Sequence, residues 1–275
     1  MDIWEEWLLE GRHHGSSAQE RQTGLQFIET ARQAVEAELR LQPGQTVLEV
    51  GCGAGDWLPR LLAATPGGGV VALDGSAGLV ERARQSLETR VPAADAARVR
   101  WLCQDLRAPL PSDLRVHAAC GRSVLQYMGT DLPAVLRTLH GALLPGGRIG
   151  FFEATPLDDP APVPRAMPER LRRKLEANWW ALPWRMGVAD YWRALRDSPF
   201  RQVRMQHSQQ ISLLDATPEL IAGVQATRPV AGEPPLGETL LRGLSPAEAE
   251  EARECFSRAE AIGVAVSWCL LAAEA

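Results

Sequence analysis

The segment Val47-Leu-Glu-Val-Gly-Cys-Gly-Ala-Gly-Asp-Trp57 decides the fold of this chain. Its first half is β-branched and aliphatic, as in a buried strand, and three alternate glycines follow directly at Gly51, Gly53 and Gly55. Glycine permits positive φ angles and lets the backbone come close to a ligand. The segment therefore predicts a strand that turns sharply into a helix, with a nucleotide across the carboxyl end of the strand.

The spacing of these glycines separates the loop from two well-known types. It is G-x-G-x-G, whereas dinucleotide-binding loops have G-x-G-x-x-G. The sequence also lacks the G-x-x-x-x-G-K-S/T pattern of phosphate-binding P-loops. Taken alone, such a loop can also be a tight turn without a ligand. The residues at the ends of the following strands are therefore needed to distinguish a ligand site from a turn.

Acidic residues follow the next two expected strands. The run 70–73 ends in Asp74, 23 residues after the first glycine of the loop, and the run 99–103 leads to Asp105. Asp74 can accept both hydroxyls of a ribose, and Asp105 can hold the exocyclic amine of a base. The alternatives are a helix N-cap for Asp74, which Ser76 can provide instead, and a turn aspartate for Asp105. Three such features on three consecutive strands predict a nucleotide site.

Short apolar runs alternate with helical periodicity along the rest of the chain. This alternation predicts a parallel sheet with helices on both faces. We expect an α/β fold that is Rossmann-like and doubly wound, with a seven-stranded, mostly parallel sheet and helical lid insertions. The expected strands are 46–50, 70–73, 99–103, 116–120, 148–153, 203–214 and 265–272, and the expected helices are 17–40, 58–64, 78–87, 132–144, 169–182, 188–197 and 246–262.

The pattern changes after Thr155, where five prolines up to Pro168 mark an irregular linker. We expect a single domain over residues 1–275, with helical insertions rather than two independent cores. Its N-terminal cap helices are expected within 1–40, and its lid insertions over 156–200 and 215–262. The tryptophan-rich stretch 179–192 predicts an apolar wall for a hydrophobic substrate; burial of these rings in a plain core is the alternative.

The composition is that of an ordinary globular protein, with 275 residues, 45% hydrophobic and 23% charged. A formal net charge of −5 argues against a general nucleic-acid binder, which would show a basic excess. No apolar stretch is long enough to predict a membrane span, and the acidic N-terminus does not predict a signal peptide. The five cysteines have no metal-ligand spacing, which predicts reduced thiols in a cytoplasmic protein and no metal site.

Five segments, in this order, resemble the class I S-adenosylmethionine (SAM)-dependent methyltransferase family. They are VLEVGCGAG (47–55), VVALDGSAGLVERAR (70–84), VRWLCQDL (99–106), GRSVLQYM (121–128) and LLPGGRIGFFE (143–153). The resemblance covers roughly residues 40–155 and is strongest to small-molecule methyltransferases with helical lids. It implies SAM as the cofactor and S-adenosylhomocysteine (SAH) as the product.

The resemblance also implies a place for each cofactor-binding residue. The methionine part of SAM would lie at the glycine loop, the ribose at the second strand, the adenine at the third, and the fourth strand would pass close by. The residues implied are Glu49, Gly51, Gly53 and Gly55; then Asp74, with Ser76 and Leu79 beside the adenosine; then Asp105 and Leu106; and last Arg122 and Ser123. His117, where the family often has an acid, is expected to be structural, because it lies at the far end of its strand.

Methyl transfer from a sulfonium is an in-line displacement with a good leaving group, so the enzyme mainly has to align the acceptor. A base is needed only where the acceptor holds its proton tightly. The catalytic candidates are His13 and His14, in a segment that closes over the cofactor in resembling enzymes, and Gln126 and Tyr127 after the fourth strand. A solvent-exposed histidine pair and packing at a helix start are the respective alternatives.

Together these features predict a SAM-dependent methyltransferase that acts on a small, fairly hydrophobic metabolite. We expect an O-methyltransferase of secondary metabolism, active as a monomer or homodimer without nucleic-acid or membrane partners; nitrogen and carbon acceptors stay open. One alternative is a methyltransferase-fold cyclase or isomerase that keeps SAM without transferring methyl. Two others are a non-enzymatic scaffold and an NAD-dependent oxidoreductase, which the loop spacing disfavours.

Overall fold

The computed structural model describes residues 18–155, 161–181, 186–226 and 234–275. The strands are β1 (Thr46–Val50), β2 (Gly69–Asp74), β3 (Val99–Cys103), β4 (Val116–Arg122), β5 (Leu143–Ala154), β6 (Arg201–Asp215) and β7 (Ala261–Glu274). They form one sheet in the order β3-β2-β1-β4-β5-β7-β6, parallel from β3 to β5, with β7 antiparallel to both of its neighbours. The predicted seven-stranded, mostly parallel sheet is confirmed.

The helices follow the predicted alternation, with three additions. Those in the described residues are α2 (Ala18–Leu39), α3 (Leu58–Ala64), α4 (Ala77–Arg90), α5 (Ala93–Ala96), α6 (Leu132–Ala142), α7 (Glu169–Trp180), α8 (Val188–Arg196), α9 (Pro218–Ala226), α10 (Leu236–Leu240) and α11 (Pro246–Ser257), with short 3₁₀ helices η2 (Leu125–Tyr127) and η3 (Gly129–Asp131). The sequence did not predict α5, α9 or α10, because all three are short and adjoin prolines. The helix expected over 246–262 ends at Ser257, and β7 begins soon after it.

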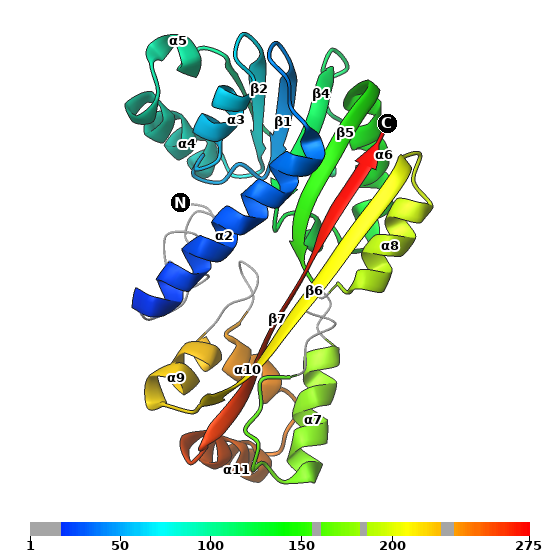
Figure 1. Ribbon diagram of the computed structural model, residues 1–275. Helices are drawn as coiled ribbons and strands as arrows, with labels where there is room; N and C mark the ends of the chain where they lie inside the picture. Colours follow the sequence, from blue (N-terminus) through cyan, green and yellow to red (C-terminus); the bar gives the residue numbers. More distant parts are fainter. Residues whose placement is uncertain (1–17, 156–160, 182–185, 227–233) are drawn as a thin grey trace.

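Helices cover both faces of the sheet (Figure 1). Side chains alternate between the faces of a strand, so Val47 packs with α2, α3 and α4, while Leu48 and Val50 pack with α6 and α8 on the other face. Burial on both faces is what a central parallel strand requires. This packing makes the carboxyl ends of the strands, where the chain leaves β1, β2 and β3, the edge that can hold a ligand.

A second, smaller lobe lies beyond that edge (Figure 1). β5 pairs with β7 only as far as Trp268, whereas β6 and β7 stay paired down to Asp215 and Ala261. This two-stranded extension leads to α7, α9, α10 and α11. The lobe has a hydrophobic cluster of its own, which includes Leu171, Leu175, Trp179, Leu240, Phe256 and Ile262. The sequence did not predict this second hydrophobic core, and the expectation of a single domain rather than two independent cores stays a prediction.

Two local features also differ from the prediction. β5 begins at Leu143 rather than at Arg148, because Leu143 already pairs with Val116 before the register shifts. Among the lid tryptophans, Trp179 is buried in the second core, whereas Trp180 and Trp192 are exposed. The predicted lid wall is thus divided between core and surface, and Trp184 lies outside the described residues.

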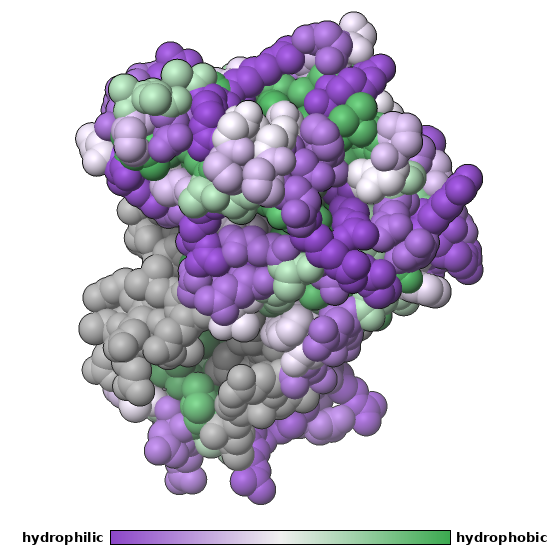
Figure 2. Space-filling view, turned by 45° about the horizontal axis from the view of Figure 1, so that its top comes forward, coloured by the Kyte–Doolittle hydropathy of each residue, from purple (hydrophilic) through white to green (hydrophobic). Residues whose placement is uncertain are grey.

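Hydrophilic residues cover much of the upper lobe on the face shown in Figure 2. Within the described ranges, no helix has the length and apolarity needed to cross a bilayer. The five cysteines are all free thiols. No group of His, Cys, Asp and Glu side chains that could hold a metal ion occurs in this part of the chain.

Candidate functional site

The three glycines of the loop after β1 all have positive φ angles, +67° at Gly51, +53° at Gly53 and +78° at Gly55. A Cβ atom on Gly51 would lie 3.0 Å from Cγ2 of Val124, and one on Gly55 would lie 2.9 Å from Cβ of Ala83. A Cβ on Gly53 would meet nothing within 4 Å among the described residues. Packing therefore requires the outer glycines, while the middle one faces open space that a ligand can approach.

Asp74, at the end of β2, is joined directly to this loop. Its Oδ2 accepts a hydrogen bond from the Gly53 N–H at 2.9 Å, and its Oδ1 accepts one from the Ser76 N–H at 2.9 Å. The Ser76 hydroxyl accepts from the Leu79 N–H at 3.1 Å and caps α4. Ser76 therefore takes the capping role, as predicted, and leaves the Asp74 carboxylate at the tip of the strand. The places of Ser76 and Leu79 beside an adenosine stay predictions.

Asp105 follows the third strand at the same edge. Asp74 pairs with Cys103 in the sheet, and Asp105 lies just beyond Cys103. The Asp105 side chain is 58% exposed, and its Oδ2 lies 3.2 Å from Nη1 of Arg107; the neighbouring Leu106 is buried. The glycine loop, Asp74 and Asp105 thus line one continuous edge formed by adjacent strands.

Glu49 and Arg32 add a pair of buried polar groups behind the loop. Glu49, on β1, is 4% exposed. Its Oε2 and the Nε of Arg32, on α2, are buried and have no hydrogen-bond partner among the described residues. Burial raises the pKa of Glu49 to about 8, and Arg32 partly opposes this rise. Buried polar groups without partners are rare, so this pair marks a place suited to the ammonium and carboxylate of an amino acid.

Arg32 was missed by the sequence analysis. It lies on α2, well before the glycine loop, among many other arginines, and nothing local distinguishes it. Only the packing of α2 against the sheet brings its guanidinium near Glu49, and the coupling shows in the pKa of that carboxyl.

Arg122 and Ser123 lie at the tip of β4, beside the loop. Ser123 has a φ of +53°, and its N–H donates to the carbonyl of Phe152 at 2.9 Å. Nη1 of Arg122 donates to Oγ of Ser123 at 3.3 Å. Burial lowers the pKa of Arg122, and the nearby positive charge of Arg32 lowers it further. Two like charges close together favour an anion beside them.

Gln126 and Tyr127 belong to η2, directly after this turn. Burial raises the pKa of the Tyr127 phenol to about 12, so this hydroxyl keeps its proton near neutral pH. Tyr127 can therefore donate a hydrogen bond but cannot act as a base there. Glu153, at the end of β5, accepts hydrogen bonds from the N–H groups of Val124 and Gln126, each at 3.2 Å. The sequence analysis gave Glu153 no role.

Three of the five histidines were given a predicted role or place. His13 and His14 lie outside the described residues, so their catalytic role stays a prediction. Nδ1 of His117 accepts a hydrogen bond from the Thr46 N–H at 3.0 Å, near the beginning of β1. His117 is therefore structural and lies at the opposite end of the sheet from the glycine loop.

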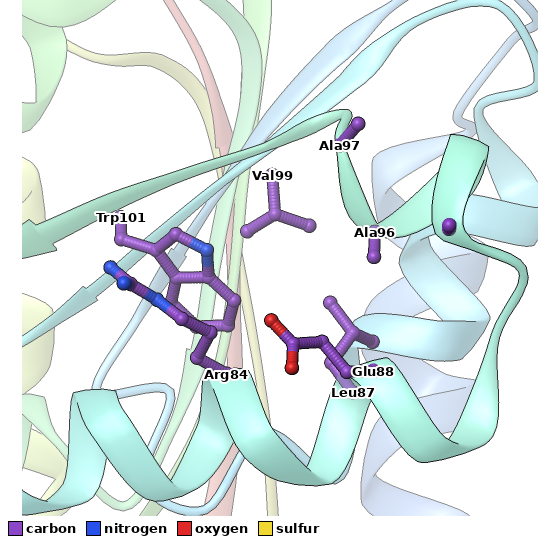
Figure 3. A pocket seen from close by; sticks show the side chains of 8 residues that line it. Arg84, Leu87, Glu88, Ala96, Ala97, Val99 and Trp101 are labelled. Atoms are coloured by element: carbon purple, nitrogen blue, oxygen red, sulfur yellow. The ribbon is translucent and has the colours of Figure 1, made fainter.

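A surface hollow between α4, α5 and β3 is a competing location (Figure 3). Leu87, Val99 and Trp101 line it, with the guanidinium of Arg84 5.9 Å from the centre of the Trp101 ring. It contains none of the predicted site residues and lies on the flank of the sheet. We place the candidate site at the strand ends, because Oε2 of Glu49, a buried carboxylate oxygen without a hydrogen-bond partner among the described residues, lies there beside the glycine loop and Asp74.

Comparison with known proteins concerns the same part of the chain. Residues 48–149, from β1 to β5, match the family described as "Methyltransferase domain". Trans-aconitate 2-methyltransferase from Azoarcus sp. is 29% identical over 192 residues, which cover 67% of this chain. The match covers 65% of that relative, so this chain spans just under two thirds of its length.

Solved structures share the fold at low identity. The YcgJ protein from Bacillus subtilis has a TM-score of 0.55 and 14% identity, over 90% of this chain and 98% of its own. Geranyl diphosphate C-methyltransferase from Streptomyces coelicolor, in complex with SAH, has a TM-score of 0.51 and 16% identity, over 93% of this chain and 84% of its own. At such identities the likeness concerns the fold alone.

Proposed function

Because this chain belongs to the class I S-adenosylmethionine-dependent methyltransferase family, we propose that it binds SAM at the ends of β1, β2 and β3 and transfers the methyl group to a small metabolite. The observation that carries this proposal is the pair of buried atoms without hydrogen-bond partners on Arg32 and Glu49, next to a glycine loop whose Gly53 N–H is bonded to Asp74. SAM supplies an activated methyl group when bound.

The chain's own residues fit the parts of SAM. Arg32 would take the carboxylate of the methionine part and Glu49 its ammonium, which satisfies both buried groups at once. Gly51, Gly53 and Gly55 would let the backbone come close to the same part. Asp74 would accept the ribose hydroxyls, and Asp105 and Leu106 would border the adenine. The pairings of Arg32 and Glu49 are between opposite charges, and that of Asp74 is between an acceptor and two donors.

For the acceptor, we propose an oxygen atom of a fairly hydrophobic metabolite, such as a product of secondary metabolism. The exposed side chains of Trp180, on α7, and Trp192, on α8, support an apolar partner. Gln126 and Tyr127 would orient the acceptor by hydrogen bonds, since Tyr127 keeps its proton. Any base would come from His13 or His14. Alignment in a water-poor site supplies the rest of the rate.

A second candidate acceptor is the oxygen of a carboxylate. Arg122 lies close enough to Arg32 for their charges to interact, and neither has an ion pair with any described residue. Such a pair can hold two carboxylates, one from SAM and one from the acceptor. Trans-aconitate, which names the relative from Azoarcus, carries carboxylates of this kind.

Mass spectrometry can test both candidates. The full chain is incubated with SAM and either trans-aconitate or a panel of apolar phenols, and SAH and products are measured. Methyl transfer adds one CH2 to the acceptor and forms equal SAH. Asp74→Ala is expected to abolish most of the turnover, whereas Asp215→Ala, an exposed change in the second lobe, should not. Acceptor consumed without a mass change would support a cyclase or isomerase, and no SAM binding at all would overturn the proposal.

The cellular compartment and the oligomeric state of the protein also stay proposals. The five free thiols support a reducing compartment such as the cytoplasm. A monomer or a homodimer, without nucleic-acid partners, fits the acidic net charge of −5.

A further inference from the structure

The loop Ser123–Met128 connects the tip of β4 to the elements that precede α6, and it carries both acceptor-facing candidates, Gln126 and Tyr127. It begins in a strained conformation, because Ser123 is not a glycine yet has a φ of +53°. Strain of this kind persists only where the surroundings hold the backbone in place. Two charged side chains from distant parts of the sequence contact this loop.

Glu153 holds the amino end of the loop. Its side chain is completely buried, and its two carboxylate oxygens accept from the N–H groups of Val124 and Gln126. Val124 is at the same time wedged between two glycines, since a Cβ on Gly121 would lie 2.8 Å from its Cγ1 and one on Gly51 would lie 3.0 Å from its Cγ2. The two hydrogen bonds and this packing therefore fix the amino end of the loop beside the glycine loop.

Arg107 holds the carboxyl end. Its Nη2 donates to the carbonyl oxygen of Tyr127 at 2.6 Å, and its Nε lies 3.0 Å from Oδ2 of Asp131. The same guanidinium contacts Asp105 at 3.2 Å. Single exposed ion pairs contribute little, but three acceptors on one planar guanidinium fix its position. An acid at the N–H end of η2 and a cation at its carbonyl end also match the direction of the peptide dipoles.

We propose that Glu153 and Arg107 are positioning residues that clamp the loop Ser123–Met128 from both ends. The clamp holds Asp105, on the adenine side, and Gln126 and Tyr127, on the acceptor side, in one fixed arrangement. Its role in methyl transfer rests on the proposed function; its existence does not. Neither residue contacts a reacting atom, so both act through the loop.

The clamp should respond to pH through Glu153. The groups that interact electrostatically with its carboxyl are Arg122 on β4, Tyr127 on η2 and Tyr191 on α8. Burial raises the pKa of Glu153 to about 7, against the hydrogen bonds from the backbone, which lower it. A protonated carboxyl is a weaker acceptor, so opening of the loop, which breaks these hydrogen bonds while Glu153 stays buried, should become easier as the pH falls from about 8 to about 6. Global unfolding exposes Glu153 to water and therefore has the opposite dependence on pH.

Hydrogen exchange of the full chain, read by mass spectrometry on the peptide that contains residues 123–128, tests the clamp. Corrected for intrinsic rates, exchange in Glu153→Gln should be about tenfold faster than in the wild type at about pH 8, and in Arg107→Gln about threefold faster. The matched controls are Glu88→Gln and Arg193→Gln, both exposed residues outside the loop. The wild-type peptide should lose protection toward about pH 6, and Glu153→Gln should not.

Measurement of SAH binding distinguishes a failure of the proposed function from a failure of the clamp. Calorimetry should give an SAH affinity in Glu153→Gln within roughly threefold of the wild type, since the hydrogen bonds of Glu153 go to Val124 and Gln126 and not to the glycine loop, Asp74 or Asp105. Absence of SAH binding in the wild type would refute the proposed function but leave the exchange result to decide the clamp. The clamp is overturned if both variants exchange as slowly as the controls. Should Glu153→Gln fail to fold, Arg107→Gln and the wild-type pH series decide alone.

Discussion

If Glu49 pairs with the ammonium of SAM or SAH, as proposed, the binding of either ligand should depend on pH by an amount that follows from the pKa of this carboxyl. Its carboxyl is nearly fully buried, and burial raises its pKa to about 8. Near pH 7 the ligand-free protein therefore holds a proton there, which the ammonium of a bound amino acid must displace. With a pKa of about 8, roughly 1% of the protein is ionised at pH 6 and roughly half at pH 8. If only the ionised form pairs with the ammonium, the affinity for SAH should rise roughly 50-fold over this range.

Isothermal titration calorimetry with SAH measures how the affinity changes with pH and whether Glu49 causes that change. Repeated near pH 7 in two buffers with different ionisation enthalpies, it should show release of close to one proton for each SAH bound. Glu49→Gln should bind more weakly and with little pH dependence, while Glu88→Gln should behave like the wild type. An affinity of the wild type that stays flat from about pH 6 to about pH 8, with no proton released, would refute the pairing of Glu49 with the ligand.

Three further predictions follow from the same contacts. The raised pKa of Glu153 means that its contribution to stability is present below about pH 4.5 and is lost as the pH rises through about 7, so urea unfolding of the ligand-free wild type should show a loss of about 3 kcal/mol that Glu153→Gln lacks. Gly55→Ala should lower the free energy of unfolding by about 2 kcal/mol, because the added methyl would meet Ala83 at 2.9 Å at a φ of +78°; an unchanged urea midpoint would contradict this. His14→Ala should lower turnover more than SAM affinity if that histidine is the base, and equal turnover would exclude it.

The sequence predicted those parts of the site that depend on local pattern. The glycine loop, Asp74 and Asp105 could be located because each directly follows a β-branched run, and parallel strands bring such ends to one edge. The capping role of Ser76 is equally local, since a helix N-cap is read from the few residues around it.

The rest depends on contacts between residues far apart in the chain. The roles proposed for Arg32, Arg107 and Glu153 depend on the packing of α2, the loop after β3 and the end of β5 around the glycine loop. A single sequence does not show that packing. The second core was missed for a similar reason, because it requires β6 and β7 to continue past the end of β5. The periodicity of apolar residues indicates how long such a strand is, but not which strands it pairs with.

The central claim is that the ends of three neighbouring strands hold one molecule of SAM, with Asp74 at the centre. Calorimetric titration of SAH into the wild type and Asp74→Ala, with circular dichroism to establish that both are folded, addresses it most directly. We expect one equivalent of SAH to bind the wild type and the affinity of Asp74→Ala to fall by more than about tenfold, as loss of a charged hydrogen-bonding group implies. Equal affinity in the two proteins, or no binding to the wild type, would contradict the claim.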